Sequence, residues 1–217
     1  MEMEGIKWNE REILRYLGCR EQEAPENVAQ MIRECERELE AAASPRAVWR
    51  EYPLSVRGAQ IDMTCLQTES RDLAKNLKDC GQVILFAATL GSQVDVLLKR
   101  YSRIQMSRAV VMQAASAAML ESWCGRKNGE LKEQYLERGL YLRPRFSPGY
   151  GDFSLECQRA IFAALALPRR IGVTLTDSLI MAPAKSVTAV IGVSRLPGSC
   201  TLQGCEACGK TDCAYRR

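Results

Sequence analysis

Residues 107–124 read SRAVVMQAASAAMLESWC, a run of small and apolar residues that indicates where the centre of the protein lies. Alanine and other good helix formers dominate the run, so we expect a helix here. A helix that is apolar on nearly every face is buried, which places this segment at the centre of the domain. The row that runs from Val110 through Ala117 reaches Glu121 one turn later. A carboxylate on a buried row is costly without a partner, so Glu121 is a candidate site residue.

The segments on either side alternate between helical and extended patterns. Apolar residues recur at helical spacing in some segments and at every second position in others, with Gly and Pro between them. Helices are expected at residues 26–42, 70–81, 90–101, 129–139 and 155–167. Strands are expected at residues 48–56, 61–66, 82–89, 140–146, 170–183 and 185–194. Ser70 and Gly81 are expected to cap the second helix. This mixed order with late hairpin-like pairs favours an α+β fold over a doubly wound sheet.

The composition is typical of one soluble globular domain. The chain has 217 residues, of which 47% are hydrophobic and 26% are charged. A net charge of +4 without a long basic stripe argues against a nucleic-acid partner. The charged start of the chain and the lack of a membrane-length apolar run predict a cytoplasmic protein without membrane contact.

A shift in composition after Leu196 predicts the domain organisation. We expect one domain at residues 1–196, with an N-terminal helical part at about residues 1–45. A cysteine-rich tail follows at residues 197–217. The chain contains no histidine, which excludes Ser-His-Asp and Cys-His catalysis and a zinc ion held by histidine.

Two arginines, two glycines and a tyrosine cluster in the segment YLRPRFSPGYGDF. Arg143 and Arg145 are two positions apart, so on a strand they would point the same way, and a guanidinium binds a carboxylate with two hydrogen bonds. Gly149 and Gly151 permit positive φ and close approach of a ligand to the backbone. Tyr150 offers a ring face to a cation. Together these residues suit S-adenosylmethionine, while a solvated strand end with a Pro-Gly turn is the alternative.

The same segment resembles the activation domain of cobalamin-dependent methionine synthase. That family has Arg-x-x-Pro-Gly-Tyr, a helix, Ile-Gly-x-x-Leu-Thr-Glu-Ser and then Met-x-Pro-x-x-Ser-Val. The matching residues here are Arg145, Pro148, Gly149, Tyr150, Ile171, Gly172, Leu175, Thr176, Asp177, Ser178, Met181, Pro183, Ser186 and Val187. The likeness extends from about Val83 to Val193, and several motifs in the family order make it specific.

The resemblance implies a single domain with a mostly antiparallel twisted sheet flanked by helices. It also implies that the protein binds S-adenosylmethionine and supports methylation of a cobalamin carried by a partner, either a methionine synthase or another corrinoid methyltransferase. An electron donor such as flavodoxin or ferredoxin would supply one electron. Because the nucleophile would be the partner's reduced cobalt, no catalytic residue is expected in this chain.

The family's ligand contacts fall on four residues of this sequence. The resemblance implies that Arg145 meets the ligand carboxylate and that backbone groups of Ser147, Gly149 and Tyr150 hold the adenosine. Ser147 stands where the family pattern has alanine, and Asp177 replaces the usual glutamate.

The family's acidic residue near the sulfonium lies in an N-terminal motif that we do not find in this sequence. Glu121 is the candidate substitute. The alternative is that Glu121 only pairs with Arg143 or Arg145.

The tail carries a second candidate site. Cys200, Cys205, Cys208 and Cys213 have the spacing C-x4-C-x2-C-x4-C within the last 18 residues. This spacing favours a metal site, with free thiols as the alternative. An iron–sulfur cluster is slightly favoured over zinc, because reactivation consumes an electron. The six other cysteines, which are expected to be small buried apolar residues, are Cys19, Cys35, Cys65, Cys80, Cys124 and Cys157.

A second functional hypothesis stays open: a metal-tailed adaptor that docks on a corrinoid protein without using S-adenosylmethionine. Two further classes are disfavoured. No G-x-G-x-x-G motif follows a strand, as a Rossmann methyltransferase would require. Few basic residues surround the tail cysteines, as a nucleic-acid-binding zinc ribbon would require.

Overall fold

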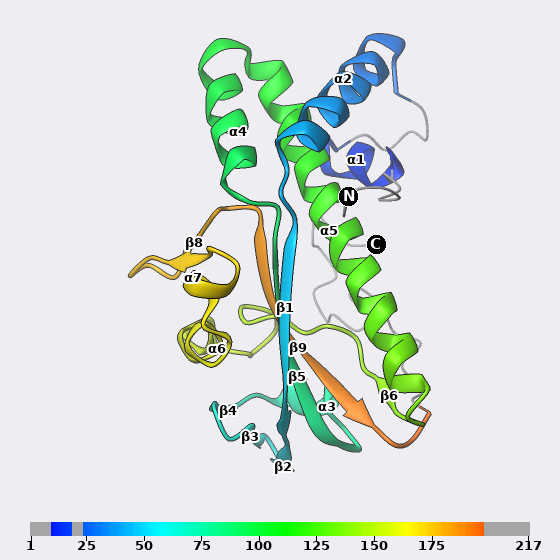
Figure 1. Cartoon of the computed structure of the whole chain (residues 1–217), viewed down its shortest axis with the longest axis vertical. Coiled ribbons are helices and arrows are strands. Elements are labelled where there is room, and N and C mark those ends of the chain that lie inside the picture. Colours follow the sequence, from blue (N-terminus) through cyan, green and yellow to red (C-terminus); the bar gives the residue numbers. More distant parts are fainter. Residues whose placement is uncertain (1–9, 19–23, 198–217) are drawn as a thin grey trace.

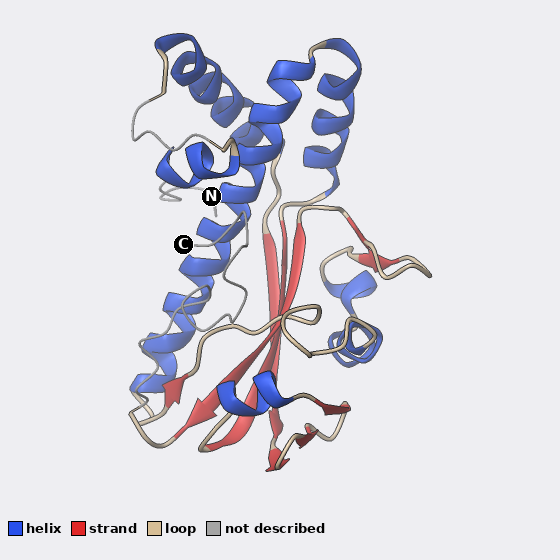
Figure 2. Ribbon diagram, turned by 180° about the vertical axis from the view of Figure 1, so that it is seen from behind, coloured by secondary structure: helices blue, strands red, loops and turns tan. Residues whose placement is uncertain are grey.

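The central sheet is antiparallel and contains four strands in the order β1, β5, β9 and β6. The computed structural model describes residues 10–18 and 24–197. Helices lie on both faces of this sheet (Figures 1 and 2). The strands are β1 (Arg46–Pro53), β5 (Cys80–Thr89), β9 (Ser186–Ser194) and β6 (Tyr141–Leu142). The α+β class and the antiparallel sheet predicted from the sequence are therefore confirmed.

β5 lies between β1 and β9 and is buried on both faces. Ile84 and Phe86 belong to the apolar core on one face, whereas Val83 and Leu85 belong to the core on the other. Successive side chains of a strand point to opposite faces, so an almost continuous apolar run contributes to two cores. The prediction of a buried strand at residues 82–89 is confirmed.

Four helices, one of which runs along the sheet, lie on the side of the first face (Figure 1). They are α1 (Glu10–Tyr16), α2 (Glu26–Ala42), α4 (Ser92–Ile104) and α5 (Met106–Leu136). α5 extends along this face (Figure 1), and the other three pack against it. Ala115, Ala118 and Met119 of α5 are fully buried. Their small or unbranched side chains let the helix lie close to the sheet.

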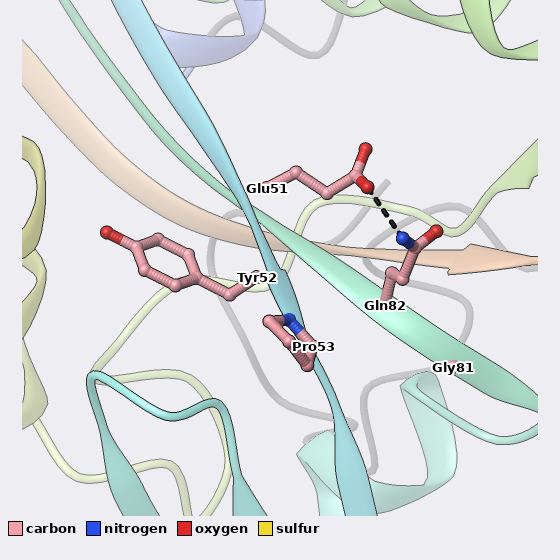
Figure 3. Close-up of a pocket in the computed structure, with 5 residues that line it drawn as sticks. All are labelled: Glu51, Tyr52, Pro53, Gly81 and Gln82. Atoms are coloured by element: carbon pink, nitrogen blue, oxygen red, sulfur yellow. Dashed lines mark hydrogen bonds between the residues drawn. The ribbon is translucent and has the colours of Figure 1, made fainter.

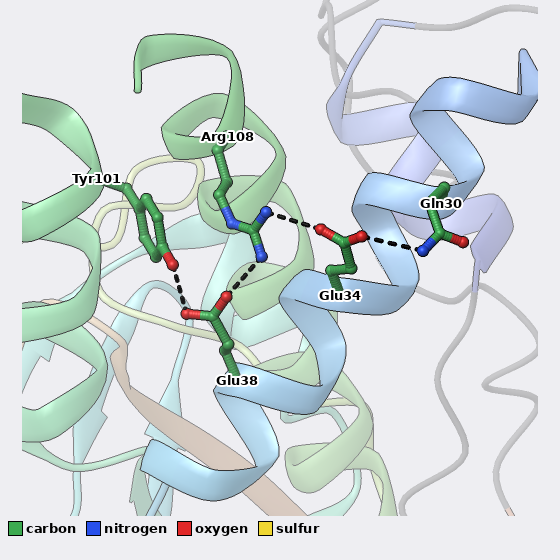
Figure 4. A network of polar contacts seen from close by, with 5 residues as sticks. All are labelled: Gln30, Glu34, Glu38, Tyr101 and Arg108. Atoms are coloured by element: carbon green, nitrogen blue, oxygen red, sulfur yellow. Dashed lines mark hydrogen bonds and ion pairs between the residues drawn. The ribbon is translucent and has the colours of Figure 1, made fainter. Parts of the chain in front are cut away.

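A charged network connects three of these helices (Figure 4). Arg108 of α5 donates hydrogen bonds to Glu34 (2.8 Å) and Glu38 (2.5 Å) of α2. Tyr101 of α4 donates to Glu38 at 2.7 Å, and Gln30 donates to Glu34 at 2.9 Å. The hydrogen bonds from Gln30 and Arg108 lower the pKa of Glu34. The network fixes how α2 and α4 lie against the first turn of α5.

Smaller elements cover the second face. They are α3 (Arg71–Asn76), α6 (Cys157–Leu165), α7 (Leu167–Arg170), the sheet of β2 (Ser55–Arg57), β3 (Gln60–Asp62) and β4 (Gln67–Glu69), and the hairpin of β7 (Thr174–Leu175) and β8 (Met181–Ala182). Phe153, Ile161 and Leu165 are buried in the core beneath them, together with Leu85. This face carries the segment that follows Arg145.

Local sequence signals predicted some helix boundaries well. The helix expected at residues 26–42 is α2. Ser70 is the N-cap of α3, because its side-chain oxygen accepts a hydrogen bond from the N–H of Leu73 at 3.0 Å. The expected C-cap is wrong, since α3 ends at Asn76 and Gly81 lies in β5.

Longer segments were divided differently from the prediction. The helices expected at residues 107–124 and 129–139 form the single helix α5, because Gly125 and Gly129 remain inside it with open space around them. The strand expected at residues 48–56 is split between β1 and β2. Residues 170–183 form the β7–β8 hairpin instead of one strand.

The cysteines of the domain lie where small apolar residues would. Cys35, Cys124 and Cys157 are buried, and Cys65 and Cys80 are half-buried. Cys19 lies outside the described residues. In the described part of the chain, no helix combines the length and the apolar character needed to cross a membrane.

Candidate functional site

Arg145 lies against α5 and pairs with Glu121. Its Nη2 atom is 2.9 Å from Oε2 of Glu121, and the two side chains are 22% and 36% exposed. The structure therefore has the ion pair that the sequence left open as the alternative role of Glu121. The predicted contact of Glu121 with a ligand cation stays a prediction.

The guanidinium of Arg145 is charged at physiological pH. Burial disfavours the charged guanidinium, but the charge and hydrogen bond of Glu121 favour it, and the pKa of Arg145 is raised. Burial also raises the pKa of the Cys124 thiol to about 12, so that thiol is neutral near pH 7. Glu121 is then the carboxylate that balances Arg145.

Arg143 does not share the position of Arg145, and the prediction that both point the same way is wrong. Arg143 is 7% exposed and donates to the carbonyl oxygen of Lys78 at 3.3 Å, on the second face of the sheet. Regular strand geometry ends at Leu142.

An extra residue in this segment explains the reversal. Leu142 pairs with Val193 and Phe146 pairs with Val190, so four steps along one segment oppose three steps along β9. Such a bulge breaks the alternation of side chains.

Residues Ser147–Gly151 form a tight turn directly after Phe146; we call this segment the binding turn. Gly149 donates to the carbonyl of Phe153 at 2.8 Å, and Tyr150 donates to the carbonyl of Ser147 at 3.1 Å. Gly149 and Gly151 have φ of +92° and +52°, a region that glycine enters without steric cost. The predicted permissive backbone is therefore present.

Aromatic rings support the binding turn from below. Phe146 lies between Tyr150 and Phe153, with ring centroids 6.4 Å and 6.3 Å away. Phe153 is buried, whereas the side chain of Tyr150 is 63% exposed. The ring of Tyr150 is thus held at the surface beside the turn, where a ligand can reach it.

The outer edge of β9 next to the binding turn has no neighbouring strand among the described residues, although Ser186 and Thr188 are only 8% and 2% exposed. Val190 exchanges two backbone hydrogen bonds with Phe146, and antiparallel alternation then turns the backbone groups of Thr188 and Ser186 to the same side. Among the described residues, no strand lies along β9 at these two positions. The side-chain oxygen of Thr188 is buried and has no hydrogen-bond partner in the described part of the chain. We call Ser186–Thr188 the open edge.

The open edge begins at a well-ordered connection. The hydroxyl of Ser186 lies 2.8 Å from Oγ1 of Thr89 and 2.7 Å from the carbonyl oxygen of Pro183. Lys185 donates to the carbonyl of Gln113 on α5 at 3.2 Å, and burial lowers its pKa. α5 therefore flanks the edge from Gln113 to Glu121.

Sequence reasoning missed Asp152, which fastens the binding turn to the first turn of α3. Its carboxylate accepts hydrogen bonds from the N–H groups of Arg71 and Asp72 at 2.7 Å and 3.1 Å. These partners are about 80 positions away in the sequence. No local signal marks such a contact. Asp177, which the sequence related to a family glutamate, lies in the loop between β7 and β8, and its carbonyl accepts from Arg159 at 2.9 Å.

The predicted metal ligands Cys200, Cys205, Cys208 and Cys213 lie outside the described residues. Within residues 10–18 and 24–197, no group of three or more Cys, Asp or Glu is placed to hold a metal ion. The prediction of a metal site therefore depends on the four tail cysteines.

Two surface hollows lie at the other end of the central strands. The first, of about 290 Å³, is lined by Glu51, Tyr52, Pro53, Gly81 and Gln82, with Glu51 and Gln82 hydrogen-bonded at 2.7 Å (Figure 3). The second, of about 820 Å³, includes Arg138 and Arg195. Neither contains a residue that the sequence predicted for the ligand.

Comparison with known proteins identifies the family. The family described as vitamin B12 dependent methionine synthase, activation domain, matches residues 71–196, which are 126 of the 217 residues. The chain belongs to this family. The match includes every residue predicted to bind S-adenosylmethionine, and it also includes β9 with the open edge.

A solved structure of the same kind supports the fold. A crystal structure titled as the MetH reactivation domain bound to AdoHcy has a TM-score of 0.59 to this chain at 16% sequence identity. The likeness covers 77% of this chain and 64% of that chain, so our chain spans less than two thirds of that protein. No curated protein matches the sequence. The activation-domain fold is thus shown.

The structure of this activation-domain family member brings five predicted residues to one edge of the sheet. Arg145 and Glu121 provide the charges, and Ser147, Gly149 and Tyr150 form most of the binding turn. This segment and α5 thus offer a cation, an anion and, at Gly149 and Tyr150, exposed backbone. This combination suits a small zwitterionic ligand with a flat heterocycle.

Proposed function

We propose that the protein binds S-adenosylmethionine at the open edge of β9 and supports reductive methylation of the corrinoid of a partner, a methionine synthase or a related corrinoid methyltransferase. The observation that carries the proposal is the position of Arg145. Arg145 stands two positions before the binding turn, inside the segment that matches the activation-domain family, and its half-buried guanidinium pairs with Glu121 of α5.

The charges of the site fit the amino-acid end of the ligand. A guanidinium binds a carboxylate with two parallel hydrogen bonds, and Arg145 already holds the carboxylate of Glu121. The ligand carboxylate would replace Glu121 as the partner of Arg145. Glu121 would then be released next to the positive end of the ligand, where its charge is favourable.

The backbone of the site fits the nucleoside end. Gly149 and Tyr150 direct their N–H groups into the turn, which leaves the outer side of the turn accessible to a ligand. Thr188 is 2% exposed, so its backbone groups on the side of β9 without a strand would become a further donor and acceptor only if the groups that cover them moved aside. A base and a ribose need such hydrogen bonds more than they need charge.

The contribution of this chain would be orientation. In the proposed reaction the partner's reduced cobalt takes the methyl group, the carbon–sulfur bond breaks and S-adenosylhomocysteine remains. One electron from a donor such as flavodoxin or ferredoxin first brings the cobalt to its reduced state. The residues of this chain hold the sulfonium in place, and no proton transfer by the chain is required.

Isothermal titration with S-adenosylmethionine tests the proposal. We expect Arg145→Ala to weaken binding by about 10- to 100-fold, the usual effect of losing hydrogen bonds to a charged group. Arg126→Ala is the matched control, because Arg126, like Arg145, pairs with a glutamate; Arg126 lies on α5, and its pair is 3.3 Å long with both side chains 39% exposed. Equal affinity of wild type and Arg145→Ala would refute the proposed site.

The Arg145–Glu121 pair also favours a second candidate function. A guanidinium that already has a carboxylate partner needs no ligand, as in an adaptor that docks on a corrinoid protein without S-adenosylmethionine. That function predicts no heat on titration for wild type, together with a stable complex between this chain and the corrinoid protein on gel filtration. Glu121→Gln would not create binding in that case.

The four tail cysteines are a donor set for a metal. Thiolates bind both zinc and iron–sulfur clusters, and an iron–sulfur cluster would suit a protein that works with one-electron donors. An absorption spectrum of protein purified without oxygen tests this. A broad band near about 400 nm supports a cluster. A colourless protein with one bound zinc supports the closed site, and a metal-free protein refutes both.

A further inference from the structure

Asp152 connects the binding turn to a helix from a distant part of the sequence. Its carboxylate accepts hydrogen bonds from the N–H groups of Arg71 and Asp72 at 2.7 Å and 3.1 Å. It also accepts the hydroxyl of Ser70, whose oxygen accepts the N–H of Leu73 at 3.0 Å. The side chains of Ser70 and Asp152 thus satisfy three N–H groups at the start of α3, and Asp152 directly follows the binding turn.

Gly151 permits this close approach. A Cβ atom at Gly151 would lie 2.4 Å from Oδ2 of Asp72, and φ there is +52°. Any other residue would be strained at this φ and would force the side chain of Asp72 to move. The glycine and the carboxylate therefore act together at neighbouring positions.

α3 is a firm support because its inner side is buried. Leu73 and Leu77 are at most 1% exposed and belong to the core on the second face of the sheet. The binding turn itself is exposed at Gly149, Tyr150 and Gly151. Local hydrogen bonds alone would leave such a turn free to move.

We propose that Asp152 is a positioning residue that holds the backbone of Ser147–Gly151 in the conformation that receives the nucleoside end of the methyl donor. The inference rests on the proposed function. Preorganisation of this kind lowers the entropic cost of ordering the turn when the ligand binds. The hydrogen bonds from Ser70 and from the N–H of Arg71 lower the pKa of Asp152, so the carboxylate is charged throughout the physiological range.

Hydrogen exchange of the ligand-free protein tests the first half of the inference. In Asp152→Asn, we expect the amides of Gly149 and Phe153, which are both hydrogen-bonded within the turn, to exchange at least about tenfold faster. Asp62→Asn is the control. Asp62 also organises a turn, by accepting from the N–H of Thr64 at 2.7 Å and from Gln67 at 2.9 Å, but that turn lies in the small sheet. Unchanged exchange at both amides would overturn the inference.

Two ligands separate positioning from a general loss of structure. S-adenosylmethionine has both a nucleoside and an amino-acid end, whereas 5′-methylthioadenosine lacks the amino acid. We expect Asp152→Asn to weaken binding of both ligands by about tenfold, and Arg145→Ala to weaken only S-adenosylmethionine. Asp62→Asn should leave both affinities unchanged even if it lowers stability.

The outcomes distinguish the two proposals. Loss of affinity for S-adenosylmethionine alone in Asp152→Asn would refute the assignment to the nucleoside end. If wild type binds neither ligand, the proposed function fails, and the positioning role for a nucleoside fails with it. Faster exchange at Gly149 would then show only that Asp152 holds the turn.

Discussion

Phe153 is the apolar anchor of the binding turn, and its truncation is a direct test of the structure. Its ring is 1% exposed and lies 6.3 Å from the ring of Phe146. Its backbone closes the turn through bonds with Gly149 and Tyr150. Phe153→Ala keeps these backbone groups and removes only the ring, so the effect measures packing.

The expected loss follows from burial. Truncation of a fully buried phenylalanine costs about 3–5 kcal/mol. We expect about 3 kcal/mol, the lower end of that range, because Phe146 is only half-buried and can move into part of the space. With an m-value of about 2 kcal/mol/M in urea, the unfolding midpoint should fall by about 1.5 M.

Urea unfolding followed by circular dichroism under reducing conditions measures this loss. Phe153→Leu, which keeps most of the apolar volume, should cost less than about 1.5 kcal/mol. Tyr150→Ala, at a side chain 63% exposed, should change the midpoint little. A loss below about 1 kcal/mol for Phe153→Ala would show that the ring is not packed as described.

The remaining predictions concern two glycines and the acid range. Gly192→Ala places a Cβ atom 2.7 Å from Sγ of Cys80, and overpacking should cost about 1–3 kcal/mol. Gly129 lies within α5 and has open space around it, so Gly129→Ala should instead raise stability by about 0.5–1 kcal/mol. Thermal melting of the two variants checks that one is destabilised and the other stabilised. The pKa values of Asp152 and Glu34 are lowered in the folded chain, so their contribution is present above the unfolded values and is lost as the pH falls through the folded ones. The urea midpoint should therefore decrease as the pH is lowered below about 4.5, and it should decrease less steeply in the Asp152→Asn/Glu34→Gln double variant. Equal decreases in wild type and double variant would contradict the lowered pKa values.

Local signals in the sequence were enough for several elements. The stripe of apolar residues in residues 26–42 predicted α2, because one buried face requires that spacing. Ser70 predicted the start of α3, because a hydroxyl can satisfy a free N–H of the first turn. Both features depend on residues within one or two turns of each other.

Features that depend on distant partners could not be predicted in this way. The bulge between Leu142 and Phe146 sends Arg143 and Arg145 to opposite faces, and only the pairing with β9 creates it. The anchor at Asp152 needs the start of α3, which the fold brings close. The length of α5 depends on its burial against the sheet. This burial keeps the helix intact across two glycines, each of which costs about 1 kcal/mol.

The candidate site illustrates the same division. The motif around Arg145 was enough to predict a turn with permissive glycines. For Glu121 the sequence left two alternatives, a contact with the ligand or an ion pair with an arginine. Sequence spacing cannot decide between them, because it does not show which side chains meet between a helix and a sheet. The outward backbone groups of Thr188 leave no trace in the sequence, since they arise from where β6 ends.

The open edge also bears on self-association. A strand without a neighbour usually attracts a strand of another copy, which leads to aggregation. Here only Ser186 and Thr188 turn their backbone groups outward, and Phe146 occupies the next position at Val190. An added strand must reach this backbone, but Ser186 and Thr188 are 8% and 2% exposed, so a second molecule cannot pair with the edge as it stands. Burial of these two residues, rather than a neighbouring strand, thus protects the protein from its own copies at this edge.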